Sequence, residues 1–93
     1  MVKHIVLWSF KEGVDKEKSF GEIKAIFDEF SPKVPGMQSL KLVRGYQGYD
    51  VCLISVHDSK EALEVYQKFP QHLEVKEVIK AVRDQRASCD FEI

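Results

Sequence analysis

Two histidines and a tyrosine are the side chains whose types and positions could do chemistry in this sequence. His4 stands in a segment, residues 2–10, where apolar and polar residues alternate as in a β-strand. Because strand residues two apart point the same way, His4 shares the apolar face with Trp8 and should be buried. An imidazole there needs a polar partner. If Tyr66, His72 and a carboxylate reach the same space, they form a small polar constellation in an apolar pocket.

Length and charge limit the kinds of protein this can be. Residues 1–93 make one domain, small enough that oligomerisation would help to stabilise it. Fourteen basic and fifteen acidic side chains leave a net charge of −1, and no basic stripe exists to follow phosphates. Nucleic acid and membrane are therefore not expected as partners. Without a signal peptide or a long apolar segment, the expected location is cytoplasmic.

The cysteines and the acidic residues give no sign of a metal or cofactor site. Cys52 and Cys89 lie in separate predicted strands without the spacing of metal ligands. They are expected to be reduced thiols that behave as small apolar side chains. No glycine-rich phosphate loop is present either. Neither a metal nor a cofactor is therefore expected.

The apolar periodicity of the first half predicts a strand, a helix and two more strands. Asp15 is expected to cap the first helix, whose apolar residues recur at spacings of three or four up to residue 30. Residues 38–46 and 49–56 then predict two strands joined by a hairpin. The second of these is apolar on both faces, which indicates a central position in a sheet.

The second half predicts two helices and a closing strand. Asp58 and Glu61 resemble a capping box that opens a short helix, and Pro70 interrupts that helix. A further helix is expected over 71–81, followed by a regularly alternating strand over 86–93. The order is that of a ferredoxin-like α+β fold, βαββαβ. It has an antiparallel four-stranded sheet, in the spatial order four, one, three, two, with helices on one face.

The sheet face turned away from the helices is also apolar. A single chain would expose this face to water, whereas two such sheets packed face to face would cover each other. We therefore expect a homodimer. The residues expected at its interface are Ile5, Leu7, Cys52, Ile54, Cys89 and Phe91.

Several short motifs spread over nearly the whole chain match one known family. They are Val2-Lys3-His4-Ile5-Val6-Leu7, Phe10-Lys11, Val34-Pro35-Gly36-Met37, Tyr66, Pro70-Gln71-His72 and Cys89-Asp90-Phe91. By these motifs the chain resembles the stress-responsive α/β-barrel domain family, a branch of the dimeric α+β barrels. The resemblance implies a two-sheet barrel built by two protomers, with a pocket in each protomer between sheet and helices. The residues expected to line that pocket are Val6, Trp8, Ile23, Phe27, Val51, Leu53, Ser55 and Phe69.

The resemblance also implies a chemistry. A few members of the family are cofactor-independent cyclases of polyketide chains, in which a Tyr and a His transfer protons, and Tyr66 and His72 match those positions. Aldol-type closure needs a base beside a carbonyl, which suits His72, and a donor to the enolate oxygen, which suits Tyr66. Asp90 would orient an imidazole. Because the last strand runs antiparallel to the first, Asp90 falls beside His4, and whether it serves His4, His72 or both stays open.

The sequence departs from the cyclase pattern in ways that change the expected ligand. Phe27 and Val51 stand where cyclases carry polar rings, and Phe69 replaces a His that often precedes the Pro. The pocket should therefore be drier and suit a small apolar or aromatic molecule. Three functions stay open: a lyase or cyclase using Tyr66 and His72, a non-catalytic binding module, and a stress protein whose role is the stability of its dimer.

Each candidate residue also has a purely structural interpretation. His4 could be a core residue whose hydrogen bonds are satisfied, and His72 could begin a helix at the surface. Tyr66 could belong to the core with a hydrated hydroxyl group. Asp90 could bond the backbone near the terminus, and His57 is most simply the boundary of its strand.

Overall fold

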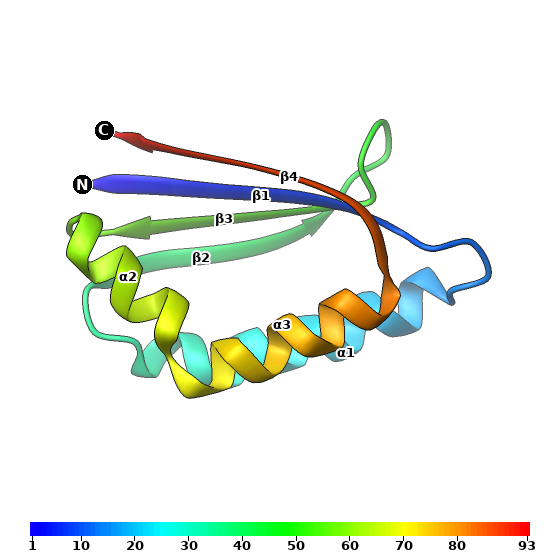
Figure 1. The fold of residues 1–93 in the computed structure, drawn as a ribbon, viewed down its shortest axis with the longest axis horizontal. Coiled ribbons are helices and arrows are strands. Elements are labelled where there is room, and N and C mark those ends of the chain that lie inside the picture. Colours follow the sequence, from blue (N-terminus) through cyan, green and yellow to red (C-terminus); the bar gives the residue numbers. More distant parts are fainter.

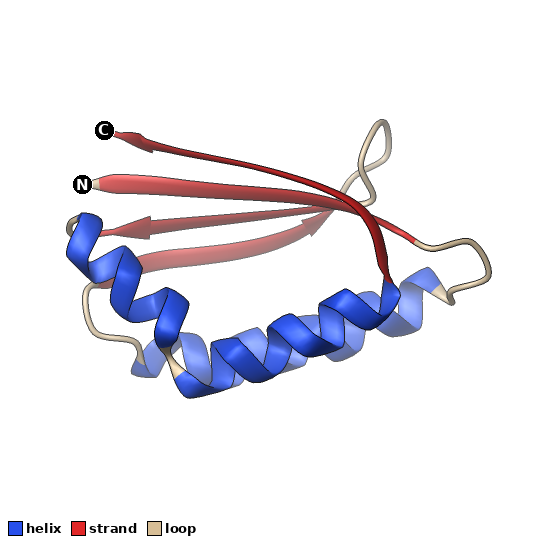
Figure 2. Cartoon of the chain, in the orientation of Figure 1, coloured by secondary structure: helices blue, strands red, loops and turns tan.

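The computed structural model describes residues 1–93 as one four-stranded sheet covered on one face by helices (Figure 1). The strands run antiparallel in the order β2-β3-β1-β4, which confirms the predicted ferredoxin-like βαββαβ arrangement. Figure 2 shows that all the helices lie on the same side of the sheet. The elements are β1 (Val2–Phe10), α1 (Lys16–Phe30), the 3-10 turn η1 (Ser31–Lys33), β2 (Met37–Arg44), β3 (Val51–His57), α2 (Lys60–Lys68), α3 (Pro70–Val82) and β4 (Arg83–Glu92).

The cap of α1 is the residue that the sequence predicts, whereas the cap of α2 is its neighbour. The Asp15 side chain accepts a hydrogen bond from the Lys18 backbone N–H at 3.1 Å, which confirms it as the cap of α1. The cap of α2 is Ser59, whose hydroxyl oxygen accepts from the Ala62 N–H at 3.1 Å. The prediction of Asp58 was wrong by one residue, because its carboxylate accepts from the Gln38 side chain instead.

The last strand begins earlier than its alternation predicts. β4 starts at Arg83, immediately after α3, and its register with β1 shifts between Trp8 and Phe10. At this irregularity the Gln85 N–H donates to the Ser9 hydroxyl oxygen at 3.1 Å. Because a bulge breaks the two-residue period locally, the alternating pattern is readable only from residue 86.

The two faces of the sheet differ in what covers them. On the helix-covered face, alternate residues of β1 and β3 are buried against the apolar stripes of the helices. On the other face, the six residues expected at a dimer interface are half-buried (Ile5, Leu7, Cys52, Ile54) or exposed (Cys89, Phe91). No helix of the chain combines the length and the apolar character needed to cross a membrane.

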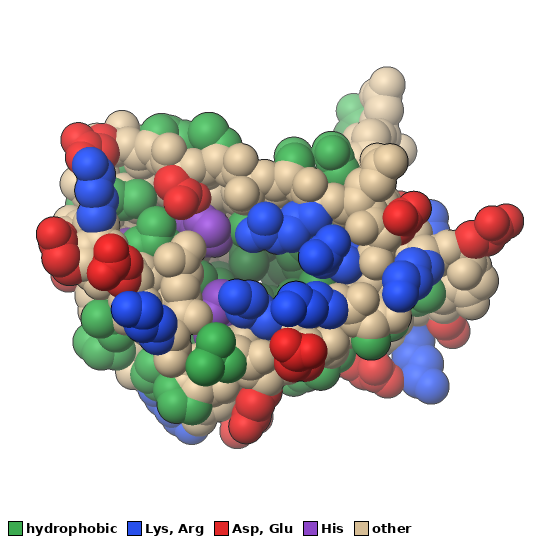
Figure 3. Space-filling view, in the orientation of Figure 1, with side chains coloured by type: hydrophobic (Ala, Val, Ile, Leu, Met, Phe, Trp, Pro, Cys, Tyr) green, Lys and Arg blue, Asp and Glu red, His purple; other side chains and the backbone are tan.

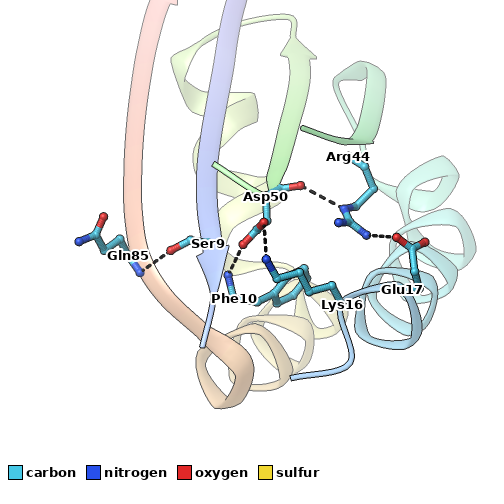
Figure 4. Close-up of polar contacts among 7 residues, drawn as sticks. All are labelled: Ser9, Phe10, Lys16, Glu17, Arg44, Asp50 and Gln85. Carbon is cyan, nitrogen blue, oxygen red and sulfur yellow. Dashed lines mark hydrogen bonds and ion pairs between the residues drawn. The ribbon is translucent and has the colours of Figure 1, made fainter. Parts of the chain in front are cut away.

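A group of polar contacts around Asp50 ties β1 to the start of α1; we call it the Asp50 cluster (Figure 4). The carboxylate accepts from the Phe10 N–H at 2.8 Å and from Lys16 Nζ at 3.1 Å. Its backbone carbonyl accepts from Arg44 Nε at 3.2 Å, and Arg44 also pairs with Glu17. The hydrogen bond from Phe10, reinforced by Lys16, lowers the pKa of Asp50.

Candidate active site

A cavity of about 480 Å³ lies between the sheet and the helices and opens between α3 and β4. Figure 3 shows the opening as a hollow in which histidine side chains are visible, with basic side chains gathered along it. Apolar side chains from the sheet and α1 form its inner wall. The lining residues are His4, Val6, Trp8, Phe27, Leu53, Gln67, His72, Lys76, Ile79, Lys80, Arg83 and Arg86.

His72 reaches the cavity from the first turn of α3. Pro70 begins this helix, and Phe69 before it has an extended backbone, so the chain changes direction between α2 and α3. The turn buries His72, whose Nδ1 lies 3.3 Å from the Gln67 carbonyl oxygen. A carbonyl can only accept, so Nδ1 carries the proton and Nε2 has a free lone pair.

The ring of His72 is uncharged at neutral pH. Burial lowers the pKa of His72 from its ordinary 6.5 to about 4, and the charge of Lys76 adds to this, against the opposing hydrogen bond to Gln67. A neutral imidazole with an unprotonated Nε2 can accept a proton from a bound molecule. His72 therefore has the state that a general base requires.

His4 meets Asp90 rather than competing with His72 for it. The two residues are direct partners in the β1–β4 register, and His4 Nδ1 donates to the Asp90 carboxylate. His4 is buried and lines the cavity, while 44% of the Asp90 side chain is exposed. The carboxylate thus fixes the tautomer and orientation of His4, whereas Gln67 does so for His72.

Tyr66 is surrounded by all three histidines of the chain, and together they form what we call the histidine–tyrosine cluster (His4, His57, Tyr66, His72). Its ring centroid lies 4.2 Å from that of His72, 5.0 Å from His57 and 6.1 Å from His4. Tyr66 is fully buried and does not line the cavity. Burial raises the pKa of Tyr66 far above its ordinary value, so its hydroxyl stays protonated, and this hydroxyl has no hydrogen-bond partner.

His57 is the member of this cluster that sequence reasoning missed. It is fully buried, and its Nε2 lies 2.9 Å from the Ser55 hydroxyl oxygen, while Nδ1 has no partner. Burial lowers the pKa of His57. The signal was present in the alternation of β3, where His57 continues the buried series of Val51, Leu53 and Ser55. Ending the predicted strand at residue 56 hid it.

Only part of the expected pocket lining faces the cavity. Val6, Trp8, Phe27 and Leu53 do so, whereas Ile23 and Val51 lie within the packed core, Ser55 is buried on β3, and Phe69 packs half-buried against the core. Ile23, Val51 and Ser55 are covered completely by neighbouring side chains, because they are 1% exposed or less. Phe69 instead stacks on Phe30, with 5.9 Å between ring centroids.

Four basic residues of the lining were not expected from the sequence. Lys76 and Lys80 are four apart on α3 and therefore lie on one face of that helix, and Arg83 and Arg86 come from β4. The cavity is thus apolar along its inner wall but basic at its mouth. No group of three or more His, Cys, Asp or Glu residues is placed to hold a metal ion.

Comparison with known families shows to which family this chain belongs. The sequence pattern of the stress responsive A/B barrel domain matches residues 2–93. The chain belongs to this family. The match confirms the resemblance drawn from the short motifs of the sequence. Comparison with curated protein sequences finds no match.

Solved structures similar to this A/B barrel domain share its fold over almost the whole length. A dimeric protein of unknown function from Bacteroides fragilis has a TM-score of 0.89 at 20% identity, over 99% of this chain and 95% of its own. An Arabidopsis thaliana protein has a TM-score of 0.85 at 27% identity, over 100% and 95%. The hydroxynitrile lyase of Passiflora edulis has a TM-score of 0.84 at 18% identity, over 99% and 92%.

Proposed function

We propose that this A/B barrel domain is a homodimer that binds a small molecule in each cavity, where His72 removes a proton next to a carbonyl group. The reaction class is a cofactor-independent lyase or cyclase step. The observation that carries the proposal is the state of His72: a buried, neutral ring at the wall of a cavity, with Nδ1 engaged and Nε2 free. The same fold occurs in a protein named as a hydroxynitrile lyase, so lyase chemistry is compatible with it.

The dimer is supported by the apolar face of the sheet and by the dimeric state of a protein with the same fold. Two such faces in contact would bury the six interface residues and close a barrel between protomers. Ile54 lies on β3, near the middle of this face. Light scattering should give twice the chain mass, and Ile54→Lys should reduce it to a single chain. A monomeric wild-type protein at micromolar concentration would contradict this part of the proposal.

Two groups are candidates for the donor that stabilises an enolate oxygen. The Tyr66 hydroxyl is protonated and lacks a partner, but it lies behind the cavity wall. His4 lines the cavity, but its Nδ1 proton is directed to Asp90, so only a doubly protonated ring would also donate from Nε2. Tyr66→Phe and His4→Gln separate the two, since only loss of the true donor slows enolisation without changing the affinity for the ketone.

Proton abstraction can be tested with a simple ketone as probe. The protein is incubated with 4-phenyl-2-butanone in D₂O, and deuterium entering next to the carbonyl is followed by NMR. We expect His72→Gln to lower the catalysed exchange rate by about 100-fold or more, the usual contribution of a general base. The matched control is His57→Gln, which changes another buried histidine of the cluster that does not line the cavity. Equal rates for wild type and His72→Gln would remove His72 from the mechanism.

A second function, binding without turnover, is favoured by the same histidine. A pKa of about 4 keeps the ring of His72 unprotonated but makes it a weak base. On this alternative the ketone binds, exchange stays at the uncatalysed rate in every variant, and His72→Gln changes only affinity. A purely structural stress protein would instead bind no ligand, and its dimer would tolerate changes at both Tyr66 and His72.

A further inference from the structure

The mouth of the cavity carries positive charge that the protein itself leaves largely uncompensated. Of its four cations, only Lys80 has a carboxylate within ion-pair distance, the exposed Glu77 at 3.7 Å. Lys76, Arg83 and Arg86 take part in none of the ion pairs of the chain. Four of the fourteen basic residues thus gather at one opening of a chain whose net charge is −1 (Figure 3).

The two arginines and two lysines approach the opening from different elements. Lys76 and Lys80 come from α3, while Arg83 and Arg86 come from β4 on the other side. Guanidinium groups can bind carboxylate or phosphate oxygens through paired N–H donors, and ammonium groups add charge without a fixed direction. An anionic head at the mouth would therefore be held from both sides.

The interior of the cavity suits the apolar part of a ligand whose anionic head lies at the mouth. Val6, Trp8, Phe27 and Leu53 give it an apolar wall, and its volume falls in the range of about 300 to 1,000 Å³ that small-molecule sites occupy. Trp8 is almost fully buried at this wall, yet its Nε1–H has no acceptor in the protein. The Nε1 atom is itself sealed from solvent, so Trp8 contributes its apolar ring to the wall and not a donor for the ligand.

We propose that the cavity takes an amphipathic organic anion, with its carboxylate or phosphate head between α3 and β4 at the mouth and its apolar body against Trp8 and Phe27. This inference rests on the proposed function, because it names the class of molecule that the cavity binds. It also revises the expected ligand from a wholly apolar molecule to an acid with an apolar body. The acid group anchors the ligand, and the interior selects its shape.

The single tryptophan of the chain provides the measurement. Because Trp8 lines the cavity, its fluorescence should change when the site is filled. Three probes share one body and differ in the head group: 6-phenylhexanoate, 6-phenylhexyl phosphate and 6-phenylhexan-1-ol. We expect the two anions to bind about 10-fold or more tightly than the alcohol, the effect of one charge-assisted contact. Added salt should weaken the anions and leave the alcohol unchanged.

Removing two positive charges at the mouth, and two elsewhere on the surface, tests whether the mouth binds the anionic head. Lys76→Gln with Arg86→Gln should lower the affinity for 6-phenylhexanoate by about 10-fold and leave the alcohol unchanged. The control, Lys18→Gln with Lys33→Gln, removes the same charge from exposed residues outside the cavity and should change neither affinity. All four positions bear solvent-exposed side chains, so the fold should tolerate both double variants.

Each outcome has a defined meaning. Equal affinity for the anions and the alcohol, or equal losses in the two double variants, would overturn the anionic ligand class while leaving the cavity a binding site. If none of the three probes changes the fluorescence or gives a heat of binding, both the anionic ligand class and the assignment of the cavity as a small-molecule site are overturned. Tight anion binding with no His72-dependent deuterium exchange would retain this inference and refute only the proposed proton transfer. The phosphate and carboxylate arms show which head group is preferred.

Discussion

The Asp50 cluster and the histidine–tyrosine cluster satisfy their polar groups to very different degrees. Both Asp50 carboxylate oxygens and its carbonyl accept hydrogen bonds, so the charged form is stabilised (Figure 4). In the second cluster the Tyr66 hydroxyl and the Nδ1 of His57 are buried without any partner. The His72 ring has lost water and gained one long hydrogen bond at 3.3 Å.

This difference separates a structural device from a candidate site. A buried polar group without a partner costs about 1 to 3 kcal/mol, so a sequence under pressure only for stability would replace it with an apolar residue. The Asp50 cluster stabilises the fold through its bonds. The histidine–tyrosine cluster instead reduces stability and holds neutral, reactive groups beside a cavity, as active sites often do.

Acid should destabilise the protein first through the histidine–tyrosine cluster. The unfolded chain protonates His72 near 6.5, but the folded chain only near pH 4, so the unfolded state binds more protons between these values. Burial of the His72 ring therefore carries no protonation cost above about pH 6.5, and it destabilises the fold progressively as the pH falls to about 4. The pKa of Asp50 is lowered from 3.8, so this carboxylate loses its contribution only at still lower pH.

We expect urea unfolding at pH 7 and pH 4.5 to differ by about 2 kcal/mol more in the wild type than in His72→Gln. Asp50→Asn should keep the wild-type difference over this interval. The same pH dependence in wild type and His72→Gln would show that the ring of His72 is not held neutral by burial.

At the Asp50 cluster, loss of the carboxylate should cost stability directly. Asp50→Ala leaves the Phe10 N–H without its acceptor and Lys16 without its partner, for an expected loss of about 2 kcal/mol. Its control is Asp28→Ala, which removes an exposed pair with Lys24 and should cost no more than about 0.5 kcal/mol. Equal losses in urea unfolding would show that Asp50 acts only as a surface charge.

Removing the polar group of Tyr66 should not lower the free energy of unfolding, in contrast to Asp50→Ala. Tyr66→Phe removes a hydroxyl that makes no hydrogen bond, so the free energy of unfolding should stay constant or rise by about 0.5 kcal/mol. Tyr46→Phe, at a 99% exposed residue, is the control and should change nothing. A loss above about 1 kcal/mol for Tyr66→Phe would reveal a partner for the hydroxyl and remove the contrast between the clusters.

Much of the fold follows from the sequence because alternation and helical periodicity are local. The Asp15 cap needs only these periods, while the strand order, and with it the placement of Asp90 beside His4, follows from the ferredoxin-like arrangement that the element order indicates. Errors arose where one neighbour overrode the pattern. Gln38 engages Asp58, so Ser59 takes the cap, and the bulge beside Ser9 hides the start of β4.

The candidate site was less predictable because it depends on how separate elements approach each other. Lys76 and Arg86 lie on a helix and a strand, and only their packing turns both toward one opening. Likewise, alternation shows that Ser55 is buried but not whether it meets a cavity or another side chain. The pairing of His72 with the Gln67 carbonyl required the turn at Pro70, whose direction no periodicity encodes.

The state of His72 is the central claim, and nitrogen NMR of the imidazole rings tests it most directly. With only three histidines, spectra of ¹⁵N-labelled wild type and His72→Gln identify the signals of His72. We predict a ring protonated at Nδ1 and free at Nε2 at pH 7, with a pKa of about 4. An Nε2-protonated ring, or a midpoint near the ordinary 6.5, would contradict the account.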